Sequence, residues 1–265
     1  MGFIRRFFPV FIIALLLNGL SIDRTIAQSS DNPPMEGFNL KDSDPKAIEI
    51  ADRVMEALGG RKNWDNTHYI TWKFFGRRLH VWDKWSGNLR LEDKNLLVLM
   101  NLNTGKGRAW EKGAEIIQPD SLTKKLQFAK SAWINDSYWM FMPYKLKDSG
   151  VTLKYRGEET LENGNKCDVL QLTFRDVGDT PQNKYYVYVN QESHLVIQWS
   201  YFSNAEDPEP RFTLPWLNWQ KYGNILLSDG RGRPSKMEDI AVFEYLPALV
   251  FESPDAVDIM SFVKK

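Results

Sequence analysis

The chain has 265 residues, and its 34 lysines and arginines are matched by 34 aspartates and glutamates, which makes the formal net charge zero at pH 7. This balance argues against nucleic acid as a partner, because nucleic-acid binding requires a basic surface, and it gives no reason to expect strong attraction to anionic lipid headgroups. The single cysteine, Cys167, has no second thiol with which to form an internal disulfide.

The N-terminal segment has the layout of a secretory signal peptide. Arg5 and Arg6 form a basic start, residues 7–17 form an almost wholly apolar run, and Thr25 and Ala27 place small residues at its exit. The apolar run is shorter than the roughly 20 residues that span a bilayer, and no later stretch is long and apolar enough to do so. We expect cleavage near Ala27, so that residues 1–27 are removed and a soluble, exported protein remains. The alternative is a retained N-terminal anchor.

Residues 28–44 are polar, contain the adjacent Pro33 and Pro34, and lack periodicity, so they predict a flexible leader. The remaining length suits one large β-rich domain or two small ones. The sequence has no strong internal repeat, and we treat residues 45–265 as a single β-rich domain.

A helix is predicted directly after the leader. Asp44 can cap it, and Pro45 suits its first position. Apolar residues then recur at helical spacing, and two glycines, which tolerate a left-handed cap, end the helix. The apolar stripe consists of Ile48, Ala51, Val54, Met55 and Leu58, and it is followed by Gly59 and Gly60. A helix with one such stripe should pack against another element.

From Thr67 the hydrophobic period changes to two, which predicts β-strands. Short alternating runs joined by turns at residues 86–88, 103–105 and 112–113 indicate an antiparallel meander. Residues 96–100 are apolar on both faces and therefore predict a strand that is covered on both sides.

A second helical stretch begins at Pro119, and its apolar stripe ends at Trp133. Two-residue periodicity then returns in residues 169–174, 185–189 and 195–201, and a further strand is predicted at 242–245. Between the helix and these strands lies a dense aromatic patch, which consists of Tyr138, Trp139, Phe141 and Met142 before Pro143. The order of helix, strands, helix and strands contains no strand-helix-strand alternation, which argues against a parallel sheet.

Aromatic residues are the most unusual feature of the composition, with ten tryptophans in the chain. Several predicted strands carry aromatics on both faces, as Tyr185 and Tyr186 illustrate. One interpretation is a filled sandwich or barrel core, since each aromatic side chain buries a large area. The other is a cavity, in which one sheet face packs on helices while the other lines a pocket for an apolar ligand. The strands alone favour the filled core.

Motifs for catalysis or metal binding are weak. His80 lies three residues before Asp83, but the histidines lack the close spacing typical of zinc sites. No Gly-x-Ser-x-Gly nucleophile elbow is present. Cys167 precedes an alternating run, which favours a strand residue over a nucleophile. We therefore predict no metal and no cofactor.

Two polar segments have a structural interpretation that we prefer to a functional one. The glycine-rich basic segment at residues 229–234 offers arginines to an anion, but a solvated turn is the favoured interpretation. Asn135 and Asp136 lie among aromatics, and we expect their side chains to hydrogen-bond backbone groups at a helix end or bend.

Three stretches resemble a group of exported bacterial proteins of unassigned function: residues 98–110, 132–139 and 142–146. The Trp-Ile-Asn-Asp-x-Tyr-Trp motif at 133–139 is the most distinctive part. Those proteins are similar in predicted fold to periplasmic lipoprotein carriers of the Lol type, which serve outer-membrane lipoprotein sorting. The resemblance implies a strongly curved antiparallel sheet, an unclosed barrel, with helices that lid an apolar cavity for acyl chains. It favours the cavity over the filled core, and no functional residue of a carrier transfers to this sequence.

We therefore predict an α+β fold, with a strongly curved antiparallel sheet and helices lidding one face. The predicted function is a binding or carrier protein for an apolar ligand such as lipid or lipoprotein acyl chains, in the periplasm of a Gram-negative-type bacterium or secreted. Residues 122–142 would form the lid, and an envelope protein is a further candidate partner. The residues expected to line the cavity are Trp72, Trp85, Trp110, Trp139, Met142, Leu172, Tyr186 and Trp199.

Two other functions stay open at this point. The first is an enzyme, such as a hydrolase of envelope polymers, that uses Asp136, Asp83 or His80. The second is a structural or interaction module with a filled core. A large cavity without convergent polar groups separates the binding protein from the enzyme, and a filled core with an exposed apolar patch favours the module.

Overall fold

The computed structural model describes residue 2, residues 31–175 and residues 177–263. The predicted signal peptide, apart from residue 2, lies outside the described residues. Within the part of the chain that the structure describes, no helix combines the length and the apolar character that a membrane span requires.

The first sheet has seven strands in the order β14-β1-β2-β3-β4-β5-β6, and every neighbouring pair is antiparallel. Apart from β14, it is the meander that the two-residue period predicts. Its strands are β1 (Tyr69–Phe74), β2 (Arg78–Asp83), β3 (Asn88–Asp93), β4 (Leu96–Asn101), β5 (Gly107–Glu111), β6 (Ala114–Glu115) and β14 (Glu238–Phe243).

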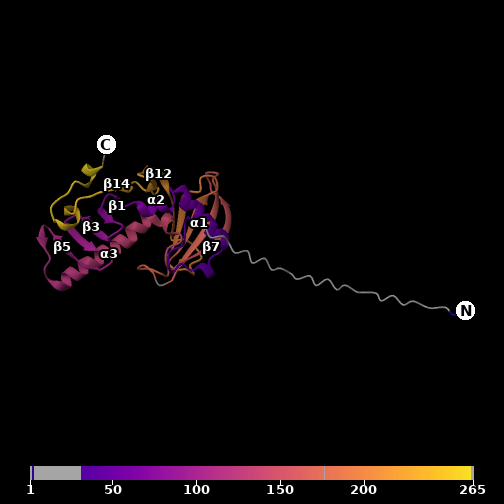
Figure 1. Cartoon of the computed structure of the whole chain (residues 1–265), viewed down its shortest axis with the longest axis horizontal. Helices are drawn as coiled ribbons and strands as arrows, with labels where there is room; N and C mark the ends of the chain where they lie inside the picture. The colour runs from indigo at the N-terminus through magenta and orange to yellow at the C-terminus, as the bar shows by residue number, and fades with distance from the viewer. Residues whose placement is uncertain (1, 3–30, 176, 264–265) are drawn as a thin grey trace.

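A second antiparallel sheet has five strands in the order β11-β10-β9-β8-β7, and a separate hairpin pairs β12 with β13. The fold is therefore α+β with open, curved antiparallel sheets, which confirms the predicted class (Figure 1). The strands are β7 (Val151–Thr160), β8 (Lys166–Phe174), β9 (Lys184–Asn190), β10 (Val196–Phe202), β11 (Phe212–Pro215), β12 (Leu217–Tyr222) and β13 (Ile225–Gly230).

A long helix, α3 (Pro119–Phe141), runs across the first sheet and reaches the second (Figure 1). It begins where Gln118 accepts a hydrogen bond from the backbone N–H of Ser121 at 2.6 Å. It continues through the predicted aromatic patch, because neither glycine nor proline interrupts it before Pro143. The other helices are α1 (Pro45–Ala57), α2 (Arg61–Asn66), α4 (Leu249–Glu252) and the 3-10 helices η1 (Leu40–Asp42), η2 (Met142–Lys145) and η3 (Ile259–Phe262).

The first helix follows the predicted pattern, with its apolar stripe buried against β7 and η2. The predicted cap is wrong in one respect. The Asp44 carboxylate makes no hydrogen bond to the helix and instead accepts from the backbone N–H of Tyr155 at 3.0 Å and from Lys154 Nζ at 3.1 Å. Asp44 therefore ties the start of α1 to β7, because a neighbouring strand offers the carboxylate a backbone donor and a cation together.

Part of the predicted leader, residues 35–39, hydrogen-bonds to the rest of the fold. The backbone N–H of Met35 donates to the carbonyl of Lys147, and that of Asn39 donates to the carbonyl of Val151, each at 3.0 Å. Phe38 is buried in the hydrophobic core. Part of the predicted leader thus packs against the fold upstream of the first helix.

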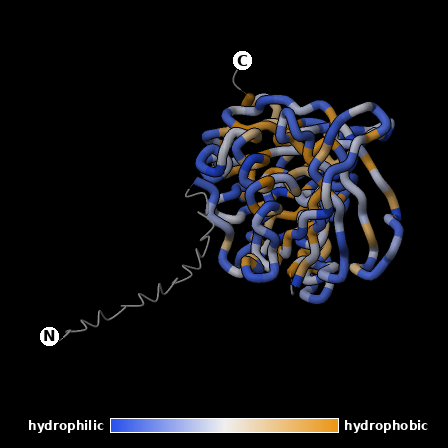
Figure 2. Tube along the Cα trace, turned by 90° about the vertical axis from the view of Figure 1, so that its right-hand side faces the viewer, coloured by the Kyte–Doolittle hydropathy of each residue, from blue (hydrophilic) through white to orange (hydrophobic). Residues whose placement is uncertain are grey.

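Both faces of the first sheet are covered. One face carries a cross-strand row that includes Trp72, His80 and Leu91, and α3 packs over it. On the other face, the buried Arg90 guanidinium donates to the carbonyls of Val250, Ser253 and Asp255 at 2.8–3.2 Å and so holds the C-terminal segment. Figure 2 shows hydrophobic segments inside the body and hydrophilic segments at its surface.

Candidate functional site

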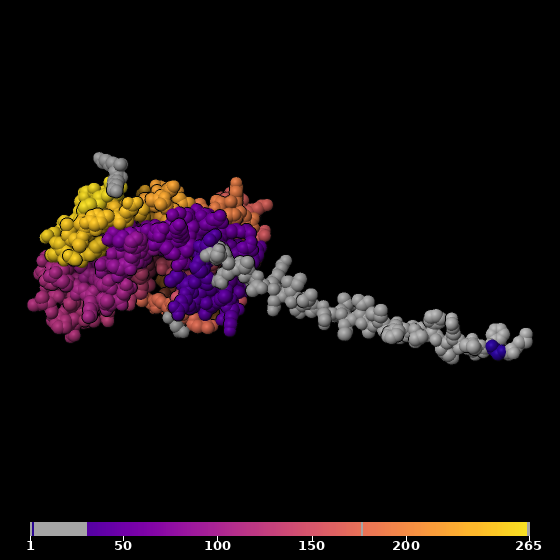
Figure 3. All heavy atoms as spheres, viewed as in Figure 1, coloured from indigo at the N-terminus to yellow at the C-terminus, as the bar shows by residue number. Residues whose placement is uncertain are grey.

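A cavity of about 770 Å³ lies between the C-terminal half of α3 and the second sheet, and we call it the α3 cavity. Figure 3 shows the surface hollowed between the magenta part, which includes α3, and the indigo N-terminal part. The volume lies within the roughly 300–1,000 Å³ that is typical of ligand pockets. Its apolar lining consists of Phe128, Ala132, Trp133, Ile134, Tyr138, Trp139, Val151, Phe174, Val177, Tyr185, Trp199, Tyr201 and Phe212.

Aromatic rings form the core of this lining. Trp199 of β10 stacks on Tyr185 of β9, with ring centroids 5.2 Å apart and planes 8° apart, and Trp139 of α3 meets Trp199 edge-on at 4.9 Å. Tyr185 lies opposite Tyr201 in the strand register, so these side chains share one face of the sheet. The rings contact one another, so this part of the cavity wall is apolar and closely packed.

A buried polar cluster adjoins the cavity. Arg78, at the start of β2, donates from Nε and Nη2 to the two carboxylate oxygens of Asp136, each at 2.7 Å. His80 Nε2 lies 2.7 Å from Asp136 Oδ2, and Asn135 Nδ2 donates to Asp136 Oδ1 at 2.9 Å. His80 and Asp136 are fully buried, while Arg78 and Asn135 line the cavity. His80 also stacks on Trp72, with ring centroids 4.6 Å apart.

One sequence interpretation of this cluster is wrong. Asp136 binds side chains rather than backbone groups, since it lies in the interior of α3, where the backbone donors are already used. His80 and Asp83 lie three residues apart on β2 and so point to opposite faces of the sheet, and His80 pairs with Asp136.

Burial and hydrogen bonding set the protonation states of the cluster. Burial lowers the pKa of His80, and the nearby Asp136 carboxylate only partly offsets this. Burial raises the pKa of Asp136, but the hydrogen bonds from His80 and Arg78 outweigh it and hold that pKa below its ordinary value. At neutral pH, a neutral His80 therefore donates from Nε2 to an ionised Asp136, and Arg78 balances the charge.

The eight residues predicted to line a cavity lie in several places. Trp139 and Trp199 line the α3 cavity together. Three others, Met142, Leu172 and Trp72, are fully buried in the main hydrophobic core. The remaining three lie elsewhere. Trp85 is 59% exposed, and Trp110 is buried in the first sheet beneath the Arg108 guanidinium. Tyr186 packs on Phe202, on the face of its strand opposite to Tyr185. A ligand-binding role for any of the eight stays a prediction.

Several lining residues were not among the eight that the sequence predicted to line the cavity, above all Arg78, Tyr138, Tyr185 and Phe212. Alternation placed Tyr185 and Tyr186 on opposite faces of one strand, but it does not tell which face is the inner one. Arg78 gives no signal of its own, because its partner Asp136 is 58 residues away in the chain.

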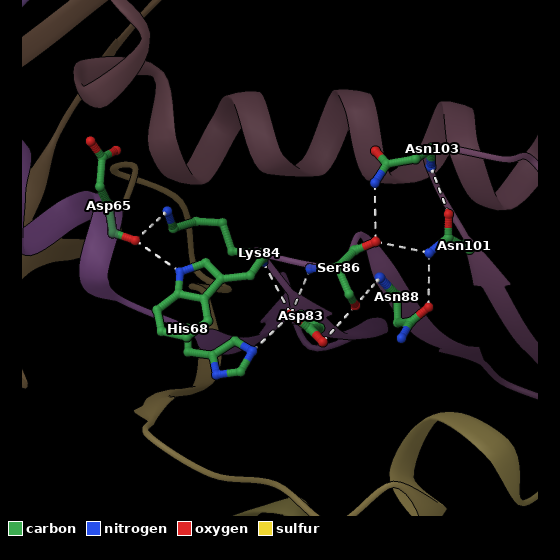
Figure 4. Close-up of polar contacts among 9 residues, drawn as sticks. Asp65, His68, Asp83, Lys84, Ser86, Asn88, Asn101 and Asn103 are labelled. Atoms are coloured by element: carbon green, nitrogen blue, oxygen red, sulfur yellow. Dashed lines mark hydrogen bonds and ion pairs between the residues drawn. The ribbon is translucent and has the colours of Figure 1, made fainter.

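Asp83, the other carboxylate considered for catalysis, belongs to a separate surface network (Figure 4). Its carboxylate accepts from the backbone N–H groups of Trp85 and Ser86 at 3.1 and 3.0 Å, and it lies 3.0 Å from His68 Nε2. The indole N–H of Trp85 donates to the carbonyl of Asp65 at 2.9 Å, and the ring stacks on His68. These contacts close the β2–β3 turn and join it to α2.

The basic segment at residues 229–234 is not a wholly solvated turn, which corrects the sequence interpretation. Arg231 is fully buried, with its guanidinium 3.5 Å from the ring centroid of Trp216. It donates to the carbonyls of Ser228, Gly230 and Trp139, and burial lowers its pKa to about 9. Arg231 therefore fixes the C-terminal end of α3 beside the β12–β13 hairpin. Cys167 is buried in β8, which confirms its assignment to a strand.

Comparisons with known proteins give only distant likenesses. No family model matches the chain, and no curated protein matches it. Among solved structures, a DUF1329 family protein from Desulfovibrio piger ATCC 29098 is 13% identical, with a TM-score of 0.41 over 78% of this chain and 97% of that one. The Pseudomonas aeruginosa MucA/MucB complex gives 16% identity and a TM-score of 0.24 over 61% of this chain and 52% of that one. MucB in complex with MucA(peri) is 13% identical, with a TM-score of 0.23 over 68% of this chain and 61% of that one. At these scores, no function is carried over from them.

Proposed function

We propose that the protein is an exported binding or carrier protein that holds the apolar part of an amphiphile, such as an acyl chain, in the α3 cavity. The observation that carries this proposal is the aromatic lining built from both α3 and the second sheet, around a volume of about 770 Å³. Each methylene that leaves water for such a lining contributes about 0.8 kcal/mol. A twelve-carbon chain therefore gains roughly 9 kcal/mol before the costs of association.

The periplasm, or secretion, follows from the signal-like N-terminus and belongs to the same proposal. A carrier also requires a partner, and we propose an envelope protein that delivers or accepts the ligand. A carrier needs a cavity that exchanges its content, and the α3 cavity is open to solvent.

The enzymatic alternative is less well supported by the geometry. The three residues considered for it, Asp136, Asp83 and His80, are each at most 6% exposed, and none of them lines the cavity. A general acid or base must come within hydrogen-bonding reach of the substrate. We therefore prefer binding to hydrolysis as the role of this site.

The test is to purify the protein after export from a bacterial host, extract it with organic solvent and identify the released lipids by mass spectrometry. Ala132→Phe is the informative variant, because Ala132 lines the cavity and a phenyl ring there takes up ligand space. Lys130→Phe adds the same ring to the exposed side of the same helix and serves as the control.

We expect wild type and Lys130→Phe to release similar amounts of acyl lipid, and Ala132→Phe to release much less while retaining the circular dichroism spectrum of wild type. Equal release from all three proteins, or none from wild type, would contradict the proposal and favour a structural or interaction module.

A further inference from the structure

We propose that Arg78 makes the α3 cavity selective for acyl esters, whose neutral carbonyl oxygen it binds, over free fatty acids and plain hydrocarbons. The inference rests on the proposed function and specifies the ligand class of that same site. It draws on two features of the cavity wall: an open donor and the balance of charge.

The open donor is Nη1 of Arg78. Nε and Nη2 are bound to Asp136 at 2.7 Å each, and the guanidinium lies 5.0 Å from the ring centroid of Phe74. Nη1 makes no hydrogen bond to a described residue. It is also not enclosed by the surrounding protein atoms. Since Arg78 lines the cavity, with 16% of its side chain exposed, Nη1 is a fixed N–H donor that a ligand can reach.

Charge decides between an ester and a carboxylate. The Arg78 charge is already balanced by Asp136, and Lys145 is balanced by Asp148 at 3.0 Å. Asp179 adds a further carboxylate to the lining. Burial lowers the pKa of His80, so this histidine supplies no compensating positive charge at neutral pH. An incoming carboxylate would thus lose hydration beside a wall with net negative charge, whereas a neutral carbonyl bears no such cost.

The test measures equilibrium binding of three probes of similar chain length, each below its aggregation limit at pH 7.5: methyl laurate, laurate and dodecane. Wild type should bind methyl laurate about tenfold more tightly than dodecane, which corresponds to about one hydrogen bond. It should also bind methyl laurate more tightly than laurate, because the carboxylate loses hydration beside a wall with net negative charge.

Arg78→Lys keeps a positive charge beside Asp136 but removes the planar fork. This variant should bind methyl laurate about tenfold more weakly than wild type and should bind dodecane with unchanged affinity. Arg108→Lys is the matched control, since Arg108 is exposed, pairs with Glu115 and lies outside the cavity lining. It should change neither affinity.

If wild type binds laurate as tightly as methyl laurate, the inference is wrong, whatever the variants show. The inference is also wrong if Arg78→Lys loses equal affinity for methyl laurate and dodecane, because an equal loss indicates that the substitution has disturbed the cavity wall in general. Equal, saturable binding of all three probes removes the inference and leaves the proposed function standing, whereas no saturable binding of any probe removes both.

Discussion

Asp136→Asn should destabilise the protein strongly, because it removes the charge at the centre of the buried cluster. Asp136 is fully buried and accepts hydrogen bonds from Arg78, His80 and Asn135. An asparagine turns an NH2 group towards donors that require an acceptor, and it leaves the Arg78 guanidinium without a counter-charge.

Removal of one partner from a buried ion pair typically costs 3–5 kcal/mol. Because Arg78 retains some contact with solvent, we expect the loss of unfolding free energy to be about 2–4 kcal/mol. Urea or guanidinium denaturation, monitored by tryptophan fluorescence and circular dichroism, measures this value with the m-value as a check on two-state behaviour.

Asp120→Asn is the matched control, since Asp120 is an exposed aspartate on the same helix, and it should cost no more than about 0.5 kcal/mol. Replacement of the pair by apolar residues, in Arg78→Met with Asp136→Leu, should recover part of the loss, because it leaves no unpaired charge. A loss in Asp136→Asn no larger than that of the control would refute the view that the cluster is a tightly paired buried unit.

Three further outcomes are expected. Leu58→Ala should lower the unfolding free energy by about 2–5 kcal/mol in chemical denaturation, because Leu58 is fully buried, and a loss below about 0.5 kcal/mol would contradict that position. Leu172→Trp should destabilise by about 1–3 kcal/mol, because Leu172 lies in the packed core rather than on the cavity wall, and an unchanged stability with weaker ligand binding would place it at the cavity instead. Wild type should lose stability as the pH falls from about 6.5, the ordinary pKa of histidine, because burial lowers the pKa of His80 in the folded state and the unfolded state therefore takes up the proton first. In His80→Gln, which keeps a donor towards Asp136, the slope of unfolding free energy between pH 7 and pH 5 should be shallower, and an unaltered slope would contradict the assignment.

Local sequence patterns predicted much of the secondary structure. The apolar stripe ending at Leu58 predicted α1 and its buried face, and the two-residue period predicted the strands and their antiparallel order. These features depend on neighbours within one turn or one strand, so the sequence displays them directly.

The site depends on information of another kind. Whether Tyr185 or Tyr186 faces inward is settled by what packs on the sheet, and a shift of one residue exchanges the two faces. The pairing of Arg78 with Asp136, and the burial of Arg231 against Trp216, join residues that are distant in the chain. Charged residues of this kind suggest a solvated surface until the fold brings a partner to them.

The most direct test of the central claim is quenching of tryptophan fluorescence by an acyl ester that carries bromine atoms along its chain. If the α3 cavity holds the chain, quenching should saturate with ligand concentration. It should be largely lost in the triple variant Trp133→Phe, Trp139→Phe and Trp199→Phe, while Trp110→Phe, outside the cavity lining, should be quenched like wild type. Quenching that does not saturate, or that persists in the triple variant, would contradict the account.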